Sequence, residues 1–508
     1  MTLSHAKLLP MLLLAGSALA TSSLPLAAQN ALPQADDSYF EAAQAALAEK
    51  LAEQPRTGRA KNVILFVGDG MSIPTVTAGR IFEGQQRGVD GESNSLAFET
   101  LPYVALSKTY THDAQVADSA PTATAMTTGV KSLNGTIGVD QTVKHDVCAG
   151  AAEAAAQSLF EQAEAAGLST GVVSTARITH ATPAATYAHT PNRDWETDKD
   201  LTEEAKANGC KDIAVQLVEW PAGNGFEVIF GGGRGNFLPA DAKDPESPDR
   251  AGSRTDGRNL IEEWQKKYND GAYVWKLDDF QAIDPAKTGH VLGLFQRSHM
   301  QYEADRAKDA GGEPSLAEMT TKAIDILSQN DDGYVLMVEG GRIDHAHHAG
   351  NAARALVDTV ALSDAVKAAL DKVNLDETLV IVTADHSHTM TINGYPKRNN
   401  PILGLAIEVD GKPSMGDDGK PYTTLTYANG PGGKVDEPRA DLTEVDTTDV
   451  DYLQQALVPI GESETHAGDD VAIFAAGPWA HLIRGVVEQN YIYHVMAKAA
   501  EMDARGAK

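Results

Sequence analysis

The sequence has little positive charge, very few cysteines and no hydrophobic stretch of the roughly 18 residues that a membrane-spanning helix needs. Its 508 residues include 42 Lys+Arg against 71 Asp+Glu, which gives a formal net charge of −29. No basic block offsets this excess, so the mean field repels phosphate and disfavours nucleic-acid binding. An acidic protein that binds phosphate needs metal ions or a few well-placed cations.

Residues 1–20 have the pattern of a secretory signal peptide. Lys7 supplies the positive charge, residues 8–14 the apolar core, and a small-x-small motif ends at residue 20; a second possible cleavage site follows Ala28. The alternative interpretation is a buried N-terminal helix. We expect a secreted protein, periplasmic if the host has an outer membrane. Because residues 502–508 (MDARGAK) lack a hydrophobic tail, we expect no membrane anchor.

The two cysteines are Cys148 and Cys210. In an oxidising compartment the expected state of two cysteines is one disulfide.

Short apolar, β-branched runs alternate with helical patterns along the chain. Such alternation is typical of a parallel sheet that helices cover on both faces. We therefore predict an α/β fold, a three-layer α/β/α sandwich with a large central, mostly parallel sheet. The runs are Asn62–Gly68, Gly171–Thr175, Phe226–Phe230, Gly333–Val338 and Thr378–Thr383, and the helical patterns between them include Ala149–Ala166 and Ser315–Ser328.

Two further segments differ from this alternation. Residues Asp36–Gln54 are Ala-rich and amphipathic, which predicts an N-terminal helix over 36–55 that is suited to docking on a second subunit. Residues 394–461 are rich in Gly, Pro, Asn and Asp, which predicts a small inserted surface subdomain. The α/β catalytic domain is then expected to comprise residues 60–393 and 462–503.

A carboxylate residue lies at the C-terminal end of three of the predicted strands. Asp69 follows the first run, Glu339 follows the fourth, and Asp385 and His386 follow the fifth. Ligands of open α/β sheets bind beyond the carboxyl ends of the strands. A single Asp after a strand is usually a turn or helix cap, but three carboxylates at one sheet edge repel one another unless cations lie between them.

Histidines accompany these carboxylates. Asp344 and His348 are four residues apart, so a helix places both on one face, as in a two-ligand metal clip. The alternative is a solvated, His-rich helix start. His388 follows Asp385 and His386, and His466 lies in a separate loop motif. Mixed Asp/His ligation with few thiols suits Zn²⁺, and the set has enough ligands for two ions.

Ser119 is the candidate nucleophile. The residues after it in Val116–Gly129 (VADSAPTATAMTTG) favour a helix and place Ser119 at its N-terminus, where free N–H groups attract an anion. The alternative is that Ser119 only caps the helix. An arginine can grip two phosphate oxygens; Arg193 is a candidate, although spacing alone does not select it among the arginines.

From Asn62 to the C-terminus the sequence resembles the alkaline phosphatases, and several motifs resemble the animal branch most closely. The resemblance implies hydrolysis of phosphate monoesters through a phosphoserine intermediate, and a homodimer. The motifs are VGDGM at 67–71, DSAPTATA at 118–125, HATPAATYAHTPNR at 180–193, VEGGRIDHAHH at 338–348, TADHSHT at 383–389 and ETHAGDDVAIFAAGP at 464–478.

The resemblance also implies a ligand set for two zinc ions and one Mg²⁺. One zinc takes Asp344, His348 and His466, the second takes Asp69, Asp385 and His386, and the third site, usually Mg²⁺, uses Asp69, Thr182 and Glu339. Ser119 becomes the nucleophile, Arg193 the phosphate clamp, Asp118 the residue that orients Arg193, and His388 a partner of a ligating carboxylate.

Two positions depart from the enteric bacterial pattern and agree with the animal branch. His180 replaces an aspartate, which tilts the third site towards nitrogen ligation and makes Mg²⁺ occupancy an open question. His345 replaces a lysine, and we expect a water-mediated contact to phosphate with a charge that titrates near neutrality. The cysteine pair also matches positions that form a disulfide in the animal enzymes.

A calcium site of the animal branch maps onto Glu246, the Phe295 carbonyl, Gln296 and Glu313. Gln296 stands where the family has an acid, so one negative charge is missing. The alternative is a solvated acidic loop.

Other functions stay open at this point. A phosphodiesterase or a sulfatase uses a similar metal framework, but residues 119–123 (SAPTA) lack the final Arg of the sulfatase motif C/S-x-P-x-R. A non-catalytic periplasmic phosphate or metal binder is the alternative from a different class.

Overall fold

The structure is a computed structural model that describes residue 32 and residues 34–505. The predicted signal peptide lies outside the described residues. The chain separates into two units, residues 1–54 and 55–508. Among the described helices, none combines the length and the hydropathy that a membrane crossing requires.

The first unit contains helix α1 (Ser38–Ala52), which matches the helix expected over 36–55. Asp37 is its N-cap and accepts hydrogen bonds from the backbone N–H groups of Tyr39 and Phe40. None of the residues of α1 is buried.

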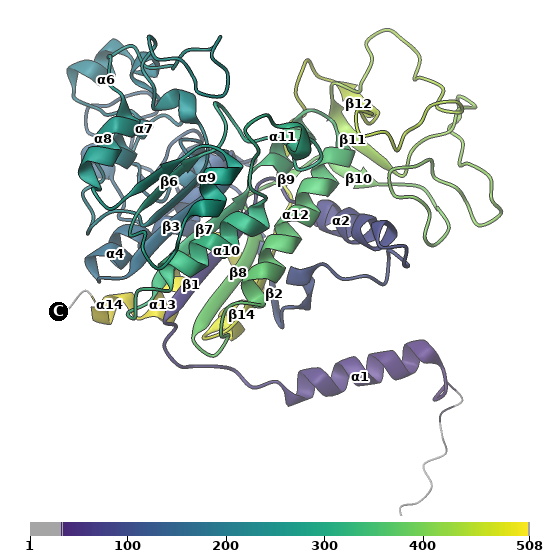
Figure 1. Ribbon diagram of the computed structural model, residues 1–508. Coiled ribbons are helices and arrows are strands. Elements are labelled where there is room, and N and C mark those ends of the chain that lie inside the picture. The colour runs from purple at the N-terminus through teal and green to yellow at the C-terminus, as the bar shows by residue number, and fades with distance from the viewer. Residues whose placement is uncertain (1–31, 33, 506–508) are drawn as a thin grey trace, which may run out of the picture. The chain divides into compact units, whose positions relative to one another are not determined.

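The described part of the second unit is built on a ten-stranded mixed sheet (Figure 1). Its central strand β1 pairs in parallel with β7 on one side and β8 on the other, and all three strands are buried along their whole length. β14 runs antiparallel to both of its neighbours. From edge to edge the order is β15 (Gly485–Glu488), β2 (Tyr103–Lys108), β14 (Val471–Ala476), β8 (Thr378–Ala384), β1 (Asn62–Gly68), β7 (Tyr334–Gly340), β3 (Ser169–Arg177), β4 (Val228–Gly232), β6 (Val291–Leu294) and β5 (Ala272–Val274).

Helices cover both faces of this sheet. Successive side chains of a strand point to opposite faces, so neighbouring residues of β1 belong to different cores. Leu65 of β1 belongs to a core that includes residues of α3 (Ser119–Thr128), α4 (Leu159–Ala165) and α13 (Tyr491–Ala500). Its neighbour Phe66 belongs to a second core that includes residues of α10 (Leu316–Leu327) and α12 (Ala352–Leu370). The predicted three-layer α/β/α architecture is thereby confirmed.

Shorter elements fill the connections. The remaining α-helices are α2 (Ile73–Gln86), α5 (Ala181–Ala184), α6 (Glu203–Ala207), α7 (Ile213–Val218), α8 (Leu260–Lys267), α9 (Leu277–Ala282), α11 (Arg342–His348) and α14 (Met502–Arg505). The 3₁₀ turns are Ala97–Thr100, Ala152–Ala154, Asp198–Asp200, Arg234–Asn236, Arg306–Lys308 and Ala480–Leu482.

Two small sheets lie outside the large one. β10 (Met390–Ile392), β11 (Leu425–Gly430) and β12 (Ala456–Pro459) form a three-stranded sheet, and β9 (Ser387–His388) pairs with β13 (His466–Ala467). Apolar side chains of the three-stranded sheet and its loops pack with α2 and the start of α12, as Leu425, Tyr427, Ala78 and Leu356 do.

The helix expected over Ala149–Ala166 is wrong in its first half. Helix α4 begins only at Leu159 because Ser158 and Glu161 form a reciprocal capping box, with the Ser158 side chain accepting from the Glu161 N–H and the Glu161 carboxylate from the Ser158 N–H. Gly150 upstream has a φ of +87°, which a helix does not accommodate. The helix expected over Ser315–Ser328 is confirmed as α10.

The expected disulfide is present. Cys148 and Cys210 are bonded, with Cα atoms 5.9 Å apart, and the bond joins positions separated by 62 residues.

Candidate active site and metal centre

The carboxyl ends of the three central strands meet at one edge of the sheet. Gly68 of β1 pairs in register with Gly340 of β7 and with Ala384 of β8. Asp69 and Asp385 follow these positions directly, and Glu339 immediately precedes Gly340. The parallel register therefore brings all three carboxylates together, and each of them is 0% exposed.

Asp344, His348 and His466 face one another through atoms that all carry lone pairs. Nδ1 of His348 donates to the Glu464 carbonyl at 2.6 Å, and Nδ1 of His466 donates to the Ala117 carbonyl at 2.7 Å. The protons therefore lie on Nδ1, and each Nε2 is left as an acceptor.

The two Nε2 atoms lie 3.1 Å apart, and Asp344 Oδ1 lies 3.4 Å from that of His348 and 3.3 Å from that of His466. A tetrahedral zinc ion with bonds of about 2.0–2.1 Å holds its ligand atoms about 3.3 Å apart. Three acceptors at these distances repel one another without a cation, so the spacing fits zinc.

A second set of candidate ligand atoms, with similar spacing, includes Nε2 of His386. We call this set and the set formed by Asp344, His348 and His466 the two cages. Nε2 of His386 lies 3.4 Å from Asp69 Oδ1 and 3.2 Å from Asp385 Oδ2. Ser119, the first residue of α3, completes the cage, with its Oγ 3.2 Å from His386 Nε2 and 3.5 Å from Asp69 Oδ1. The candidate nucleophile thus lies at the position of a fourth ligand.

The third predicted site is a set of buried oxygens without hydrogen-bond partners. These atoms are Asp69 Oδ2, Thr182 Oγ1 at the start of α5, and Glu339 Oε1. The other oxygen of Glu339 accepts a hydrogen bond from Ser174. An all-oxygen set suits Mg²⁺, and a buried oxygen without a partner is costly unless an ion binds it.

Burial and mutual repulsion raise the pKa values of two of these carboxyl groups, Asp69 and Glu339. Burial raises the pKa of Asp69 well above its usual value, with Asp385, Asp344 and Glu339 adding to the effect. Burial likewise raises the pKa of Glu339 to about 7. Bound divalent cations would favour the ionised carboxylates and reverse this electrostatic cost.

Burial keeps the ligating imidazoles neutral. It lowers the pKa of His386 well below its usual value and lowers that of His348. Burial also raises the pKa of Asp344, but the hydrogen bond and the positive charge of His388 outweigh it, so the pKa of Asp344 lies well below its usual value. Neutral imidazoles and an ionised carboxylate are the forms that ligate zinc.

Arg193 is held from two sides. Its Nη1 donates to Asp118 Oδ1 at 3.0 Å and its Nη2 donates to His180 Nε2 at 3.1 Å. Asp118 is also the N-cap of α3 and accepts from the Ala120 N–H at 2.7 Å. The residue next to the candidate nucleophile therefore also orients the candidate phosphate clamp.

The sequence agrees with a known enzyme family. A sequence profile of the family described as alkaline phosphatase matches residues 60–502. The chain belongs to the alkaline phosphatase family. An alkaline phosphatase of Gadus morhua is 46% identical over 448 residues, which cover 87% of this chain and 92% of that protein. The tissue-nonspecific isozyme of Rattus norvegicus is 44% identical over 504 residues, covering 97% and 93%.

Solved structures agree with the fold. The alkaline phosphatase of Thermus thermophilus superimposes with a TM-score of 0.62 at 24% identity, covering 88% of this chain and 93% of that one. The alkaline phosphatase of the Antarctic bacterium TAB5 gives a TM-score of 0.59 at 24% identity, covering 87% and 99%. The family membership makes this chain a metal-dependent phosphatase that acts on phosphate monoesters.

His299 was missed by the sequence analysis. It joins His180 and His345 in a cluster whose ring centroids lie 4.1–5.5 Å apart. Nδ1 of His299 accepts from the Arg177 N–H at 3.2 Å and its Nε2 faces the Arg177 guanidinium, while Nε2 of His180 accepts from Arg193. We therefore interpret the cluster as the surroundings of the phosphate clamp rather than as a further metal site.

The expected titration of His345 near neutrality is wrong. Burial lowers the pKa of His345 to about 3, so this imidazole is neutral near pH 7. His180 is shifted in the same direction by burial, with Arg193 and His345 contributing, and its pKa lies well below the usual value.

Two of the acids predicted for calcium, Glu246 and Glu313, lie near each other and near Asp309. Glu246 accepts hydrogen bonds from Arg234 at 2.8 Å and from the Gly311 N–H at 3.1 Å. Gln296 donates to Asp309 at 3.1 Å, so Asp309 brings a carboxylate to the position where Gln296 lacks one. Asp309 Oδ2 and Glu313 Oε1 are buried without hydrogen-bond partners.

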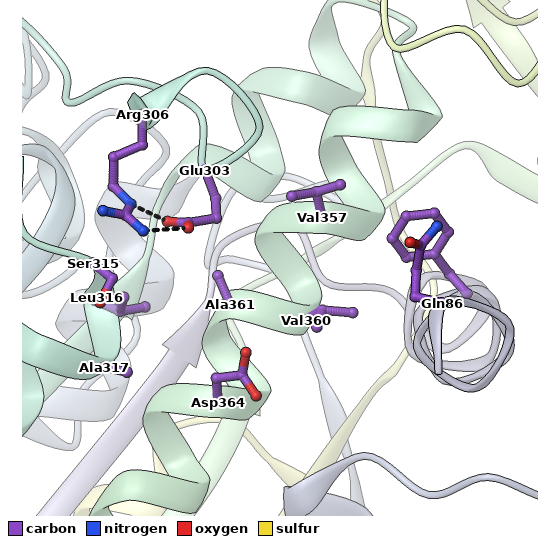
Figure 2. Close-up of a pocket in the computed structure, with 11 residues that line it drawn as sticks. Gln86, Glu303, Arg306, Ser315, Leu316, Ala317, Val357, Val360, Ala361 and Asp364 are labelled. Atoms are coloured by element: carbon purple, nitrogen blue, oxygen red, sulfur yellow. Dashed lines mark hydrogen bonds and ion pairs between the residues drawn. The ribbon is translucent and has the colours of Figure 1, made fainter. Parts of the chain in front are cut away.

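A separate cavity of about 550 Å³ lies among α2, α12 and the start of α10 (Figure 2). Arg306 and Glu303 form an ion pair at its rim, with Nε 2.8 Å from Oε2, and Val357 and Val360 of α12 line the wall. None of its lining residues belongs to the predicted site.

Proposed function

We propose that the enzyme hydrolyses phosphate monoesters through a phosphoserine on Ser119, in a centre of two zinc ions and one Mg²⁺. One zinc would be held by Asp344, His348 and His466, the second by Asp69, Asp385 and His386, and Mg²⁺ by Asp69, Thr182 and Glu339. The observation that carries the proposal is the pair of acceptor cages with the 3.1–3.4 Å spacing of zinc ligands, the second of which includes Ser119 Oγ.

Ser119 would attack phosphorus in line with the leaving oxygen. Its place at the N-terminus of α3 directs backbone N–H groups and the helix dipole at the phosphoryl group. Arg193 would hold two of the phosphate oxygens throughout, while Asp118 and His180 keep the guanidinium in place. When bound, the zinc ions would supply Lewis acidity for ionising the hydroxyl and for stabilising the leaving oxygen.

A water molecule would then cleave the phosphoserine from the opposite side and release inorganic phosphate. Each displacement inverts the configuration at phosphorus, so the sum of the two is retention. Direct attack by water on the substrate would give inversion instead. A substrate with a chiral phosphoryl group therefore tests the covalent step, and an inverted product would contradict it.

Metal analysis tests the assignment of ligands. We expect two zinc ions per chain in the purified enzyme, one lost in Asp344→Ala and the other in Asp385→Ala. His145→Ala provides a control, because His145 is exposed and pairs with Asp146, outside the predicted site. Loss of both ions in either single variant, or of neither, would contradict the partition.

We propose that Glu246, the Phe295 carbonyl, Gln296 and Glu313 bind Ca²⁺ with help from Asp309. The support is that Asp309 Oδ2 and Glu313 Oε1 are buried without hydrogen-bond partners. Burial also raises the pKa of Glu313 to about 8 and that of Asp309 to about 6. Glu313→Gln should abolish the rise in thermal stability on adding Ca²⁺, and an unchanged rise would contradict the site.

We further propose that the enzyme is secreted, to the periplasm where the host has an outer membrane, and that it forms a homodimer. Helix α1 and the inserted subdomain 394–461 are the proposed contacts. Leu47 and Leu51 of α1 support this, since they are 58% and 74% exposed. Light scattering should give a dimer for the mature chain and a weaker dimer after removal of residues 1–55; a monomer for the mature chain would contradict the proposal.

A further inference from the structure

Glu464 is a buried carboxylate two residues before His466, and its side chain is 0% exposed. Oε2 accepts a hydrogen bond from Nδ1 of His388 at 2.5 Å. Oε1 accepts from the backbone N–H of Thr389 at 2.7 Å and from its hydroxyl at 2.5 Å. Both oxygens are therefore engaged by protein donors, and the carboxylate does not itself face the metal cage.

His388 connects this carboxylate to the zinc cage. Its Nε2 donates to Asp344 Oδ1 at 2.7 Å while its Nδ1 donates to Glu464. The ring packs against His347, with centroids 4.9 Å apart and planes 29° from parallel. His347 is anchored in turn by Thr75 at 3.0 Å and Tyr427 at 2.7 Å. Each ring nitrogen of His388 thus donates to a carboxylate, and one face of the ring packs against His347. These contacts hold His388, and His388 in turn holds Asp344 Oδ1 in position.

The main chain of Glu464 holds a second ligand. Its N–H donates to the His348 carbonyl at 2.8 Å, and its carbonyl accepts from Nδ1 of His348 at 2.6 Å. This pair of bonds sets both the tautomer and the direction of the His348 ring. Two of the three ligands of one proposed zinc ion are therefore oriented from one residue.

We propose that Glu464 is a positioning residue for the zinc ion held by Asp344, His348 and His466. Glu464 keeps His388 in place, and His388 holds the Asp344 carboxylate in the position of a zinc ligand. This inference rests on the proposed function, because it requires zinc at that site. Residues that orient metal ligands typically change metal affinity about 10–100-fold when they are replaced.

Glu464→Gln is the decisive variant. Glutamine keeps the volume of the side chain, but its single carbonyl oxygen cannot serve both His388 and Thr389 as acceptors. Holoenzyme is mixed with a chromogenic zinc chelator, and the release of each ion is followed with time. We expect one of the two zinc ions to be released about 10–100-fold faster than from the wild type, because its binding is weaker by that factor. The release of the other ion should be unchanged.

Glu462→Gln is the matched control, because Glu462 is an exposed residue of the same segment. It should release both ions as the wild type does. Release from Glu464→Gln within about twofold of the wild type at both sites would overturn the positioning role.

Two other outcomes are distinguishable. If the wild type itself does not hold two zinc ions, the proposed function fails, and this inference fails with it. Thermal unfolding of the metal-free proteins separates folding from positioning. We expect metal-free Glu464→Gln to unfold at the temperature of the metal-free wild type, and a much lower temperature would assign Glu464 to folding and overturn the proposal.

Discussion

The hydroxyl oxygen of Ser119 lies 3.2 Å from Nε2 of His386. The His386 ring stacks on His466 with centroids 3.6 Å apart and planes 19° from parallel. His386 belongs to one candidate zinc cage and His466 to the other. Ser119 therefore contacts one cage directly, through His386. The stacked rings of His386 and His466 connect that cage to the other. This arrangement suits a nucleophile that attacks between two metal ions.

Ser119→Ala should reduce turnover of p-nitrophenyl phosphate by about 10³-fold or more, because the variant has no oxygen with which to form a covalent intermediate. Acid quenching during turnover should trap labelled phosphate on the peptide that contains Ser119 in the wild type only. Ser93→Ala, at an exposed serine, is the control. Undiminished turnover in Ser119→Ala would exclude the covalent step.

Asp118→Ala should weaken the binding of inorganic phosphate. The variant removes the acceptor that lies 3.0 Å from Arg193 Nη1 and leaves the guanidinium less constrained. A hydrogen bond between charged groups contributes about 1.5–3 kcal/mol, so we expect the inhibition constant of phosphate to rise at least about tenfold.

Asp118→Asn separates this effect from helix capping. Asparagine retains the N-cap of α3 but loses the charge and the Oδ2 acceptor of the Gly135 N–H, so it should weaken phosphate binding and lower the melting temperature less than Asp118→Ala does. Asp118→Ala should in addition cost about 1 kcal/mol of stability. An unchanged inhibition constant in both variants would show that Asp118 does not orient the clamp.

Asp358 should make stability depend on pH. It is 4% exposed on α12, and burial raises its pKa to about 7. The folded protein keeps a proton there that the unfolded chain releases above pH 3.8, so the contribution of Asp358 to stability is present at low pH and is lost as the pH rises to about 7.

Asp358→Asn imitates the protonated form at every pH. Its stability relative to the wild type should therefore rise between about pH 4 and pH 7, by on the order of 1–4 kcal/mol, and then level off. Denaturant unfolding at pH 5 and pH 8 measures this difference. Asp371→Asn, at an exposed position at the end of the same helix, is the matched control variant. A pH-independent difference for Asp358→Asn would refute the expected titration.

Loss of the disulfide should destabilise the fold. The bond closes a loop between positions 62 residues apart, and removing a disulfide over such a loop costs about 3–5 kcal/mol. The double variant Cys148→Ser/Cys210→Ser should melt at a lower temperature, and a reductant should lower the melting temperature of the wild type but not of the variant. Equal melting temperatures for all of these would contradict a stabilising role.

Much of the site follows from local sequence patterns. Buried β-branched runs predict β1, β7 and β8, and parallel strands bring their carboxyl ends to one edge, so the meeting of Asp69, Glu339 and Asp385 was predictable. The spacing of Asp344 and His348 predicts their common face on α11 in the same way. The expected helix over 149–166 was wrong in its first half because a capping box at Ser158 outweighed the helix propensity of the alanines before it.

The sequence by itself determined the α/β/α fold, the family and the residue types of the site, because these depend on short-range periodicity and on motifs. Only the tertiary structure decided how the ligands are oriented. Glu464 and His466, the first residue of β13, lie more than a hundred residues beyond His348 in the chain. No local pattern reveals that Glu464 accepts a hydrogen bond from His388 at 2.5 Å. The shifted pKa of His345 likewise depends on burial among distant segments, which raises the cost of charging the imidazole.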